Sequence, residues 1–264
     1  MLVVDLGRAR ETVQWVFVNT FDELAHATIE GLREHLPVIP VGPLLEPDDA
    51  DGECESSPAA DDDDGCTAWL DARPPRSVVF VAFGSLVNND SGEVAEIAAG
   101  LASTGRPFLW VVRDDTRDLL SPDALAAACL DRDRGKVVPW CAQGRVLAHP
   151  AVGCFVTHCG WNSTAEALAA GVPVVASPRW SDQRINARFL VDVHRVGVRA
   201  PTPLTRDALR ERVEEAMGGP EAAAMARRAA GWKEKARAAL RGGGSSDRGV
   251  QVFVDQIRHA GARH

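Results

Sequence analysis

Apolar segments of strand length alternate with segments of helical spacing along most of this chain. Residues 77–83 form a continuous apolar run of strand length, and further strands are predicted at 108–112, 136–139, 153–159, 172–176 and 196–199. Segments with helical patterns follow most of them, at 91–103, 122–130, 162–170 and 183–193. Strands that are apolar on both sides and alternate with amphipathic helices predict an α/β fold, with a parallel sheet covered on both faces.

The two ends of the chain add further elements. Near the start, residues 13–19 predict a buried strand and 38–41 a short apolar piece. Between them, Thr20 and Glu23 have capping-box spacing, which predicts a helix from Thr20 to about His35. The patterns at 205–217, 221–240 and 247–259 predict helices that complete the chain, with a flexible joint at Gly242–Gly244.

An acidic segment separates the first of these elements from the alternating region. Residues 46–66 hold many Asp and Glu and almost nothing apolar, which predicts a solvated linker. A calcium loop is the alternative interpretation, but the alternating ligand spacing and the closing Glu of such a loop are missing.

Composition narrows the class of protein and its partners. The chain has 264 residues, of which 45% are hydrophobic and 25% charged, as in a soluble globular protein. A net charge of -8 argues against general binding to nucleic acid or to an anionic membrane, and no apolar run has the length of a membrane span. We do not expect the first residues to be a secretory signal, and we expect the six cysteines of such a chain to be reduced thiols. We therefore expect a cytoplasmic protein.

One strand-to-helix turn is a candidate anion site. The strand at 153–159 is followed by a tight turn at Gly160 and Trp161, and the next helix is predicted to start at Asn162 and Ser163, which are good capping residues. The first N–H groups of a helix lack internal partners and carry partial positive charge, so they favour an anion. Three further turns, at 84–85, 140–143 and 180–183, are expected on the same rim of the sheet. No nicotinamide fingerprint and no P-loop occur in the sequence.

The stretch from Trp140 to Gln183 carries a family resemblance. It reads WCAQGRVLAHPAVGCFVTHCGWNSTAEALAAGVPVVASPRWSDQ. It closely resembles the signature box of plant secondary-product UDP-glycosyltransferases, which are glycosyltransferases of family 1. The flanking segments agree with that family as well: VNTFDEL (18–24), VGPLL (41–45), AWLD (68–71), SVVFVAFGS (77–85) and FLWVVR (108–113).

The resemblance implies a GT-B fold of two Rossmann-like domains. The C-terminal domain of such enzymes binds the UDP-sugar, and the N-terminal domain binds the acceptor. We expect residues 1–45 to be a remnant of the acceptor-binding domain, 46–66 the linker, 67–245 a complete donor-binding domain and 246–264 a C-terminal helix.

The resemblance also assigns the nucleoside end of the donor site. Trp140 would stack on uracil, with Cys141 in the same turn, Gln143 would bond near the ribose or base, and Glu166 would accept hydrogen bonds from the ribose hydroxyls. Two alternatives concern single residues: Trp140 as a rim tryptophan that packs on a helix, and Glu166 as a solvated helix charge.

The diphosphate end uses the anion site. Ser85, His158, Asn162 and Ser163 would contact the diphosphate around the turn at Gly160 and stabilise the charge that UDP gains on leaving. No metal is expected, because these donors would replace it. A metal at Cys154, His158 and Cys159 is the alternative; it lacks a second ligand pair, so buried thiols are favoured.

The sugar end completes the assignment. Asp182 and Gln183 would bind sugar hydroxyls, and Trp161 would pack the turn and line the pocket. A final Gln resembles glucose-preferring members, so UDP-glucose is the expected donor. The expected acceptor is a small plant metabolite. Cys141 and Ala142, where many relatives have Ala-Pro, resemble the branch that makes glucose esters of carboxylic acids, so the resemblance favours a carboxylic acid.

The catalytic histidine of the family has no counterpart here. Its relatives carry the general base in an early loop, and no histidine of this chain lies in such a loop: His26, His35, His149, His158, His194, His259 and His264. Two hypotheses remain: an inverting glucosyltransferase of which this chain is a truncated form, and a UDP-sugar-binding module without its own catalysis.

Overall fold

The computed structural model describes residues 13–45, 65–84, 91–113 and 134–261, and the chain divides into two compact units. One unit comprises Met1–Leu45 together with Trp232–His264, and the other comprises Glu46–Gly231. The boundary between them falls within α11 (Ala222–Leu240), so the end of the chain clusters with its beginning.

The larger unit, Glu46–Gly231, is built on a parallel sheet. Within the described residues this sheet has six strands in the order β5-β4-β3-β6-β7-β8, and every pairing is parallel. The strands are β3 (Val78–Ala82), β4 (Phe108–Val111), β5 (Gly135–Val138), β6 (Val152–Thr157), β7 (Val174–Ala176) and β8 (Gly197–Arg199). The order reverses between β3 and β6, and the crevice beyond such a reversal is where open α/β sheets bind ligands. The predicted parallel sheet is confirmed.

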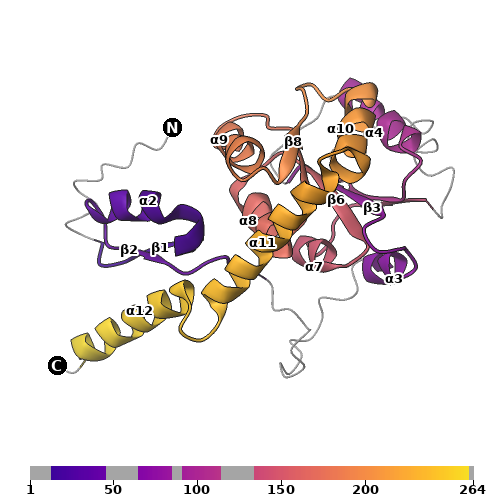
Figure 1. Cartoon of the computed structure of the whole chain (residues 1–264). Helices are drawn as coiled ribbons and strands as arrows, with labels where there is room; N and C mark the ends of the chain where they lie inside the picture. Colours follow the sequence, from indigo (N-terminus) through magenta and orange to yellow (C-terminus); the bar gives the residue numbers. More distant parts are fainter. Residues whose placement is uncertain (1–12, 46–64, 85–90, 114–133, 262–264) are drawn as a thin grey trace. The chain divides into compact units, whose positions relative to one another are not determined.

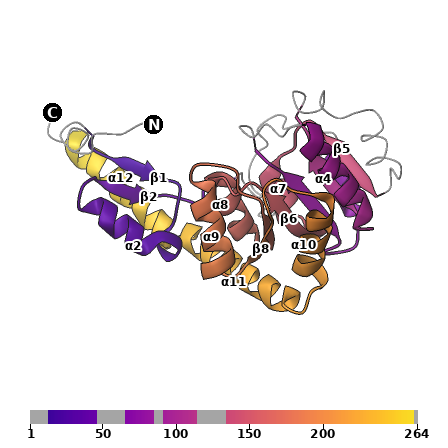
Figure 2. The same cartoon turned by 90° about the horizontal axis from the view of Figure 1, so that it is seen from above.

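Helices cover both faces of this sheet (Figures 1 and 2). On one face α4 (Ser91–Ser103) packs against α10 (Arg206–Gly218). The other face carries α7 (Gln143–Ala148), α8 (Trp161–Ala170) and α9 (Gln183–Arg188), and α3 (Cys66–Asp71) packs on α7. A five-residue π-helix, Phe189–Val193, follows α9.

Side chains along the central strands point alternately to the two faces of the sheet, and each face has its own hydrophobic core. Val79 and Val81 of β3 join the cluster under α4 and α10, whereas Phe80, between them, points to the other face. There its ring stacks on that of Phe155 in β6, with centroids 4.9 Å apart. All five residues of β3 are buried, which explains why this strand reads as a continuous apolar run.

The smaller unit joins the two ends of the sequence. Its strands β1 (Val16–Val18) and β2 (Val38–Pro40) are parallel neighbours, connected through α2 (Asp22–Arg33), and α12 (Ser245–Gly261) packs on β2. The ring of Phe253 in α12 meets Trp15 and Phe17 edge-on, at 5.2 and 4.7 Å between centroids. This unit appears in Figure 1 as the indigo and yellow elements.

The capping box predicted at Thr20 is wrong. Helix α2 begins at Asp22 with Phe21 at its N-cap, and no side chain caps it. The Thr20 hydroxyl is buried without a hydrogen-bond partner, and the Glu23 carboxylate accepts a bond from Ser245 Oγ at 2.8 Å. A contact with α12, far away in the sequence, therefore takes the place of the local box.

Several other predicted boundaries changed. Helices α3 and α7 were not predicted, because six residues are too few to display a helical period. The helix predicted at 183–193 is α9 continued by the π-helix. The helix predicted at 122–130 and residues 46–64 of the predicted linker lie outside the described residues, whereas the linker's last residue, Cys66, is buried at the start of α3.

Candidate functional site

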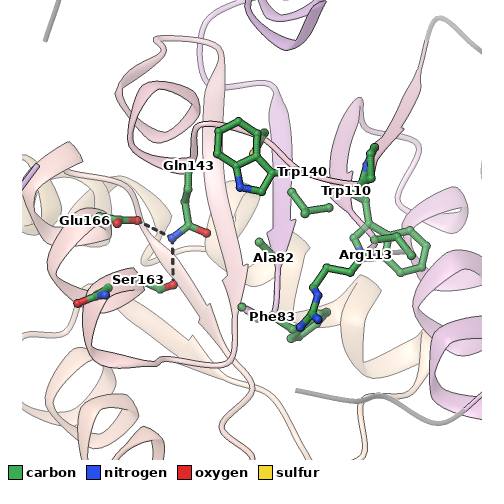
Figure 3. A pocket seen from close by; sticks show the side chains of 14 residues that line it. Ala82, Phe83, Trp110, Arg113, Trp140, Gln143, Ser163 and Glu166 are labelled. Atoms are coloured by element: carbon green, nitrogen blue, oxygen red, sulfur yellow. Dashed lines mark hydrogen bonds between the residues drawn. The ribbon is translucent and has the colours of Figure 1, made fainter. Parts of the chain in front are cut away.

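A cavity of about 440 Å³ opens at the carboxyl ends of β3, β4 and β5, beside the start of α8. In Figure 3, Gln143, Ser163 and Glu166 form one wall, while Trp110 and Arg113 stand opposite. The cavity is lined by Ala82, Phe83, Gly84, Trp110, Val111, Val112, Arg113, Pro139, Trp140, Cys141, Gln143, Asn162, Ser163 and Glu166. Six of the twelve predicted donor residues are in that set: Trp140, Cys141, Gln143, Asn162, Ser163 and Glu166.

Trp140 presents its indole to the cavity. It follows β5, after Pro139, and 59% of its surface is exposed, which is unusual for a side chain of this size. Cys141, the next residue, is buried. An exposed aromatic plane at the mouth of a cavity is the surface on which a planar base can stack.

A hydrogen-bond network joins α7 to α8 on the facing wall. Gln143, the first residue of α7, donates through Nε2 to Ser163 Oγ at 3.0 Å and to Glu166 Oε2. Because these two bonds use both protons of the amide, its oxygen remains the group that can accept from a ligand. The network holds the Glu166 carboxylate at the cavity wall.

The start of α8 differs from the predicted cap. The N-cap residue is Gly160, the helix begins at Trp161, and no side chain caps it. Asn162 and Ser163 therefore lie inside the first turn, and their predicted role as capping residues is wrong. The chain turns at Cys159, which has a left-handed backbone at φ 63° and directly precedes Gly160. The result is a helix N-terminus beside the cavity, as an anion site requires.

His158 lies just behind the cavity, between two glycines. A Cβ added to Gly84 would come within 2.6 Å of His158 Cε1, and one added to Gly160 within 2.5 Å of Nε2. The imidazole is buried, and this burial lowers the pKa of His158 to about 4, against a smaller opposing effect of Asp182. His158 is therefore neutral at physiological pH and can donate one N–H.

Asp182 and Gln183 are not among the residues that line the cavity. Asp182 Oδ2 accepts from Asn186 Nδ2 at 2.9 Å, in the turn that opens α9. Gln183 is buried, and its Oε1 accepts from the backbone N–H groups of Arg179 and Trp180 at 2.8 and 3.2 Å. The loop that they form ends beside His158, whose pKa responds to Asp182.

Two more predicted residues remain to be located. Trp161 is half-buried as the first residue of α8 and does not line the cavity. Ser85 lies outside the described residues. The alternative metal site is not supported: Cys154 and Cys159 are buried free thiols, and no group of metal-ligating side chains occurs within the described ranges.

Sequence reasoning missed the wall formed by Trp110 and Arg113. Trp110 lies near the end of β4 and Arg113 follows that strand, and both line the cavity. The rule that ligands lie beyond strand ends, which located the other turns, applies equally to this strand and could have found them. In the part of the chain that the structure describes, no helix is long and apolar enough to cross a membrane.

Known proteins are similar to this chain in sequence. A family model described as UDP-glucoronosyl and UDP-glucosyl transferase matches residues 9–226. Gallate 1-beta-glucosyltransferase of Quercus robur is 44% identical over 254 residues, covering 92% of this chain and 49% of that protein. Indole-3-acetate beta-glucosyltransferase of Zea mays is 45% identical over 265 residues, covering 94% of this chain and 55% of that protein. The chain thus spans about half the length of the curated relatives it matches.

Solved structures agree with the sequence matches. The crystal structure of Os79 from O. sativa in complex with UDP superposes with a TM-score of 0.83 at 35% identity, covering 94% of this chain and 56% of that chain. The α/β fold of GT-B type is thereby confirmed. Since the family model extends over most of the sequence and both kinds of relative agree with it, the chain belongs to the UDP-glucoronosyl and UDP-glucosyl transferase family.

Proposed function

We propose that the cavity binds the UDP part of a UDP-sugar, with UDP-glucose as the donor. The observation that carries this proposal is the Gln143–Ser163–Glu166 network beside the exposed Trp140. The indole supplies a stacking surface for uracil, and the fixed Glu166 carboxylate accepts from ribose hydroxyls. The name of the Os79 structure, which contains UDP, supports the same ligand.

The diphosphate lies at the start of α8 in this proposal. The backbone N–H groups of its first turn, the Ser163 hydroxyl and the N–H of neutral His158 face the phosphate oxygens, with Asn162 and Ser85 as further donors. These groups stabilise the negative charge that UDP gains when the glycosidic bond breaks. This proposal assigns no step to a metal ion.

The proposed reaction is inverting transfer of glucose to a small plant metabolite. Relatives named for gallate and indole-3-acetate suggest a carboxylic acid acceptor and a glucose ester product. A carboxylate is already ionised at neutral pH, so it attacks the sugar carbon without first losing a proton. A cytoplasmic location is part of this proposal. Donor binding without transfer is the second candidate, because the chain matches about half of its relatives.

Calorimetry with UDP tests the site itself. We expect Trp140→Ala to weaken UDP binding by about tenfold or more, since base stacking contributes roughly 1–3 kcal/mol. Glu166→Ala should also weaken UDP binding and should affect UDP more than dUDP, because the carboxylate acts on the ribose hydroxyls. Glu211→Ala, an exposed carboxylate of α10, is the matched control and should change nothing. Unchanged UDP affinity in both site variants would refute the proposed placement.

An activity assay separates the two candidate functions. The protein is incubated with UDP-glucose and gallate or indole-3-acetate, and release of UDP is followed together with formation of the ester. Transfer supports the glucosyltransferase. Binding of UDP-glucose in the same preparation, without ester formation, supports the donor-binding module.

A further inference from the structure

A buried ion pair lies next to the proposed sugar end of the site, outside the cavity. Arg179 follows β7, Glu93 is in the first turn of α4, and Arg179 Nη2 lies 2.6 Å from Glu93 Oε1. Only 12% and 7% of the two side chains are exposed. Apolar residues of similar volume often stabilise a fold as well as a buried ion pair does, so stability alone does not account for this one.

The ion pair ties together three separate segments of the larger unit. Glu93 Oε1 also accepts from the backbone N–H of Leu204, just before α10, at 2.6 Å. The Arg179 guanidinium lies over the ring of Phe83, 5.6 Å from its centroid, and Phe83 lines the cavity. The contact with Glu93 is an ion pair without hydrogen-bond geometry, because Nε and Nη2 of Arg179 have no hydrogen-bond partner among the described residues. It places Arg179 between α4, the segment before α10 and Phe83 of the cavity lining.

The loop that carries Arg179 is held at both of its ends. Thr202 Oγ1 donates to the carbonyl of Pro178 at 2.9 Å. At the other end, Gln183 Oε1 accepts from two backbone N–H groups, those of Arg179 and Trp180. Because only an oxygen can accept these two bonds, the orientation of the Gln183 amide is determined and its NH₂ group is turned away from them. These bonds hold the loop at both ends, and within it Ser181 has a left-handed backbone at φ 54°.

This arrangement brings polar and aromatic groups to the rim beside His158. Trp180 is 52% exposed, and the exposed Asp182 is oriented by Asn186, which also donates to the Cys159 carbonyl at 3.0 Å. His158 in turn packs against Gly84 of the cavity wall. In the proposed placement of UDP, the sugar attached to the diphosphate lies near these groups.

We propose that the Glu93–Arg179 ion pair is a positioning device for the donor sugar, which holds loop 178–182 so that Asp182 and the Gln183 NH₂ group meet the hexose. This inference rests on the proposed function. Neither Glu93 nor Arg179 touches the sugar in this proposal; both act through the loop. The ion pair should therefore affect the affinity for UDP-glucose and leave the affinity for UDP unchanged.

The test compares the two ligands in variants that keep the fold. In the double variant Glu93→Gln/Arg179→Met, the introduced amide can still accept from the Leu204 N–H, and no buried charge is left unpaired. We expect its UDP affinity to stay within about twofold of the wild type, while its UDP-glucose affinity falls by about tenfold in Kd by calorimetry. Arg179→Lys keeps a cation within reach of Glu93 and should retain most of the UDP-glucose affinity.

The single variant Arg179→Met provides the stability control. It leaves the Glu93 carboxylate buried without its cation, so its melting temperature should drop, and the double variant should recover much of that loss. A purely structural ion pair would lower the melting temperature without changing the ratio of the two affinities. The inference is overturned if the double variant binds UDP normally and keeps the wild-type ratio. If the proposed function itself is wrong, the wild-type protein will not bind UDP, which distinguishes that outcome from a failure of this inference alone.

Discussion

His158 lies in surroundings that keep its imidazole neutral. It is packed between Gly84 and Gly160, and burial lowers its pKa to about 4. Arg179 adds to this lowering, whereas Asp182 opposes it. The side chain can then supply an N–H to an anion without the cost of burying a charge, and the helix N-terminus beside it provides the positive potential.

The lowered pKa of His158 predicts how stability depends on pH. An unfolded histidine takes up a proton near pH 6.5, whereas His158 in the folded state stays neutral until about pH 4. The unfolded state therefore binds more protons across this window, and the free energy of unfolding falls as the pH is lowered from 6.5 towards 4. Between pH 7 and pH 5 the loss due to His158 is about 2 kcal/mol.

Urea denaturation at pH 7 and pH 5 measures this loss. In His158→Gln the side chain stays polar but does not titrate, so the difference in unfolding free energy between the two pH values should be smaller by about 2 kcal/mol than in the wild type. Other histidines contribute equally to both proteins and cancel in the comparison. An equal difference in the two proteins would contradict a neutral His158.

The side chain of His158 joins the connection after β3 to the connection after β6. In the connection after β3, Gly84 has a left-handed backbone at φ +73°. In the connection after β6, Gly160 is the N-cap residue of α8. The ring of His158 lies against both. The diphosphate end of the proposed site is therefore built by packing between two connections, and each connection depends on a residue without a Cβ.

Substitution of Gly84 tests this packing. In Gly84→Ala the new methyl group would lie 2.6 Å from His158 Cε1, on a backbone that L-residues rarely adopt. We expect a loss of about 1–3 kcal/mol in unfolding free energy and weaker UDP binding, because His158 must move.

Gly144→Ala is the matched control. Gly144 lies in α7, and nothing comes within 4 Å of an added Cβ. The unfolding free energy of this variant should rise by about 1 kcal/mol or less. Equal effects of the two substitutions, in thermal melts and in calorimetry with UDP, would rule out the close contact at Gly84.

The sheet and most helices could be predicted because their patterns are local. The helix at 91–103 was predicted with its observed bounds, since its apolar face repeats over three turns. The Glu93–Arg179 ion pair and the bonds of Gln183 could not be predicted, because they depend on how separate loops are brought together. The caps expected at Thr20 and Ser163 failed for the same reason: Glu23 bonds to Ser245, and Ser163 bonds to Gln143.

The division of the chain into two compact units separates the proposed donor site from the chain ends. Every residue that lines the cavity belongs to Glu46–Gly231. The unit formed by Met1–Leu45 and Trp232–His264 has its own contacts, among them the aromatic cluster of Trp15, Phe17 and Phe253. The sequence predicted a strand at 13–19 and the helices of this smaller unit, but the strand was expected to be buried, whereas β1 is not and Phe17 is 46% exposed. It did not predict that residues 232–245 cluster with the beginning of the chain, because such contacts leave no local pattern.

Phe253→Ala tests whether the two units are energetically separable. The ring of Phe253 meets both Trp15 and Phe17 edge-on, so its removal should cost about 1–3 kcal/mol in the smaller unit, less than a fully buried aromatic side chain. Hydrogen exchange should then report lower protection in β1, β2 and α12, with unchanged protection in β3 and β6. The affinity for UDP should stay within about twofold of the wild type, because no group of the cavity is altered. A parallel loss of UDP affinity would mean that the smaller unit stabilises the donor site, and the two units would then have to be treated as one cooperative structure.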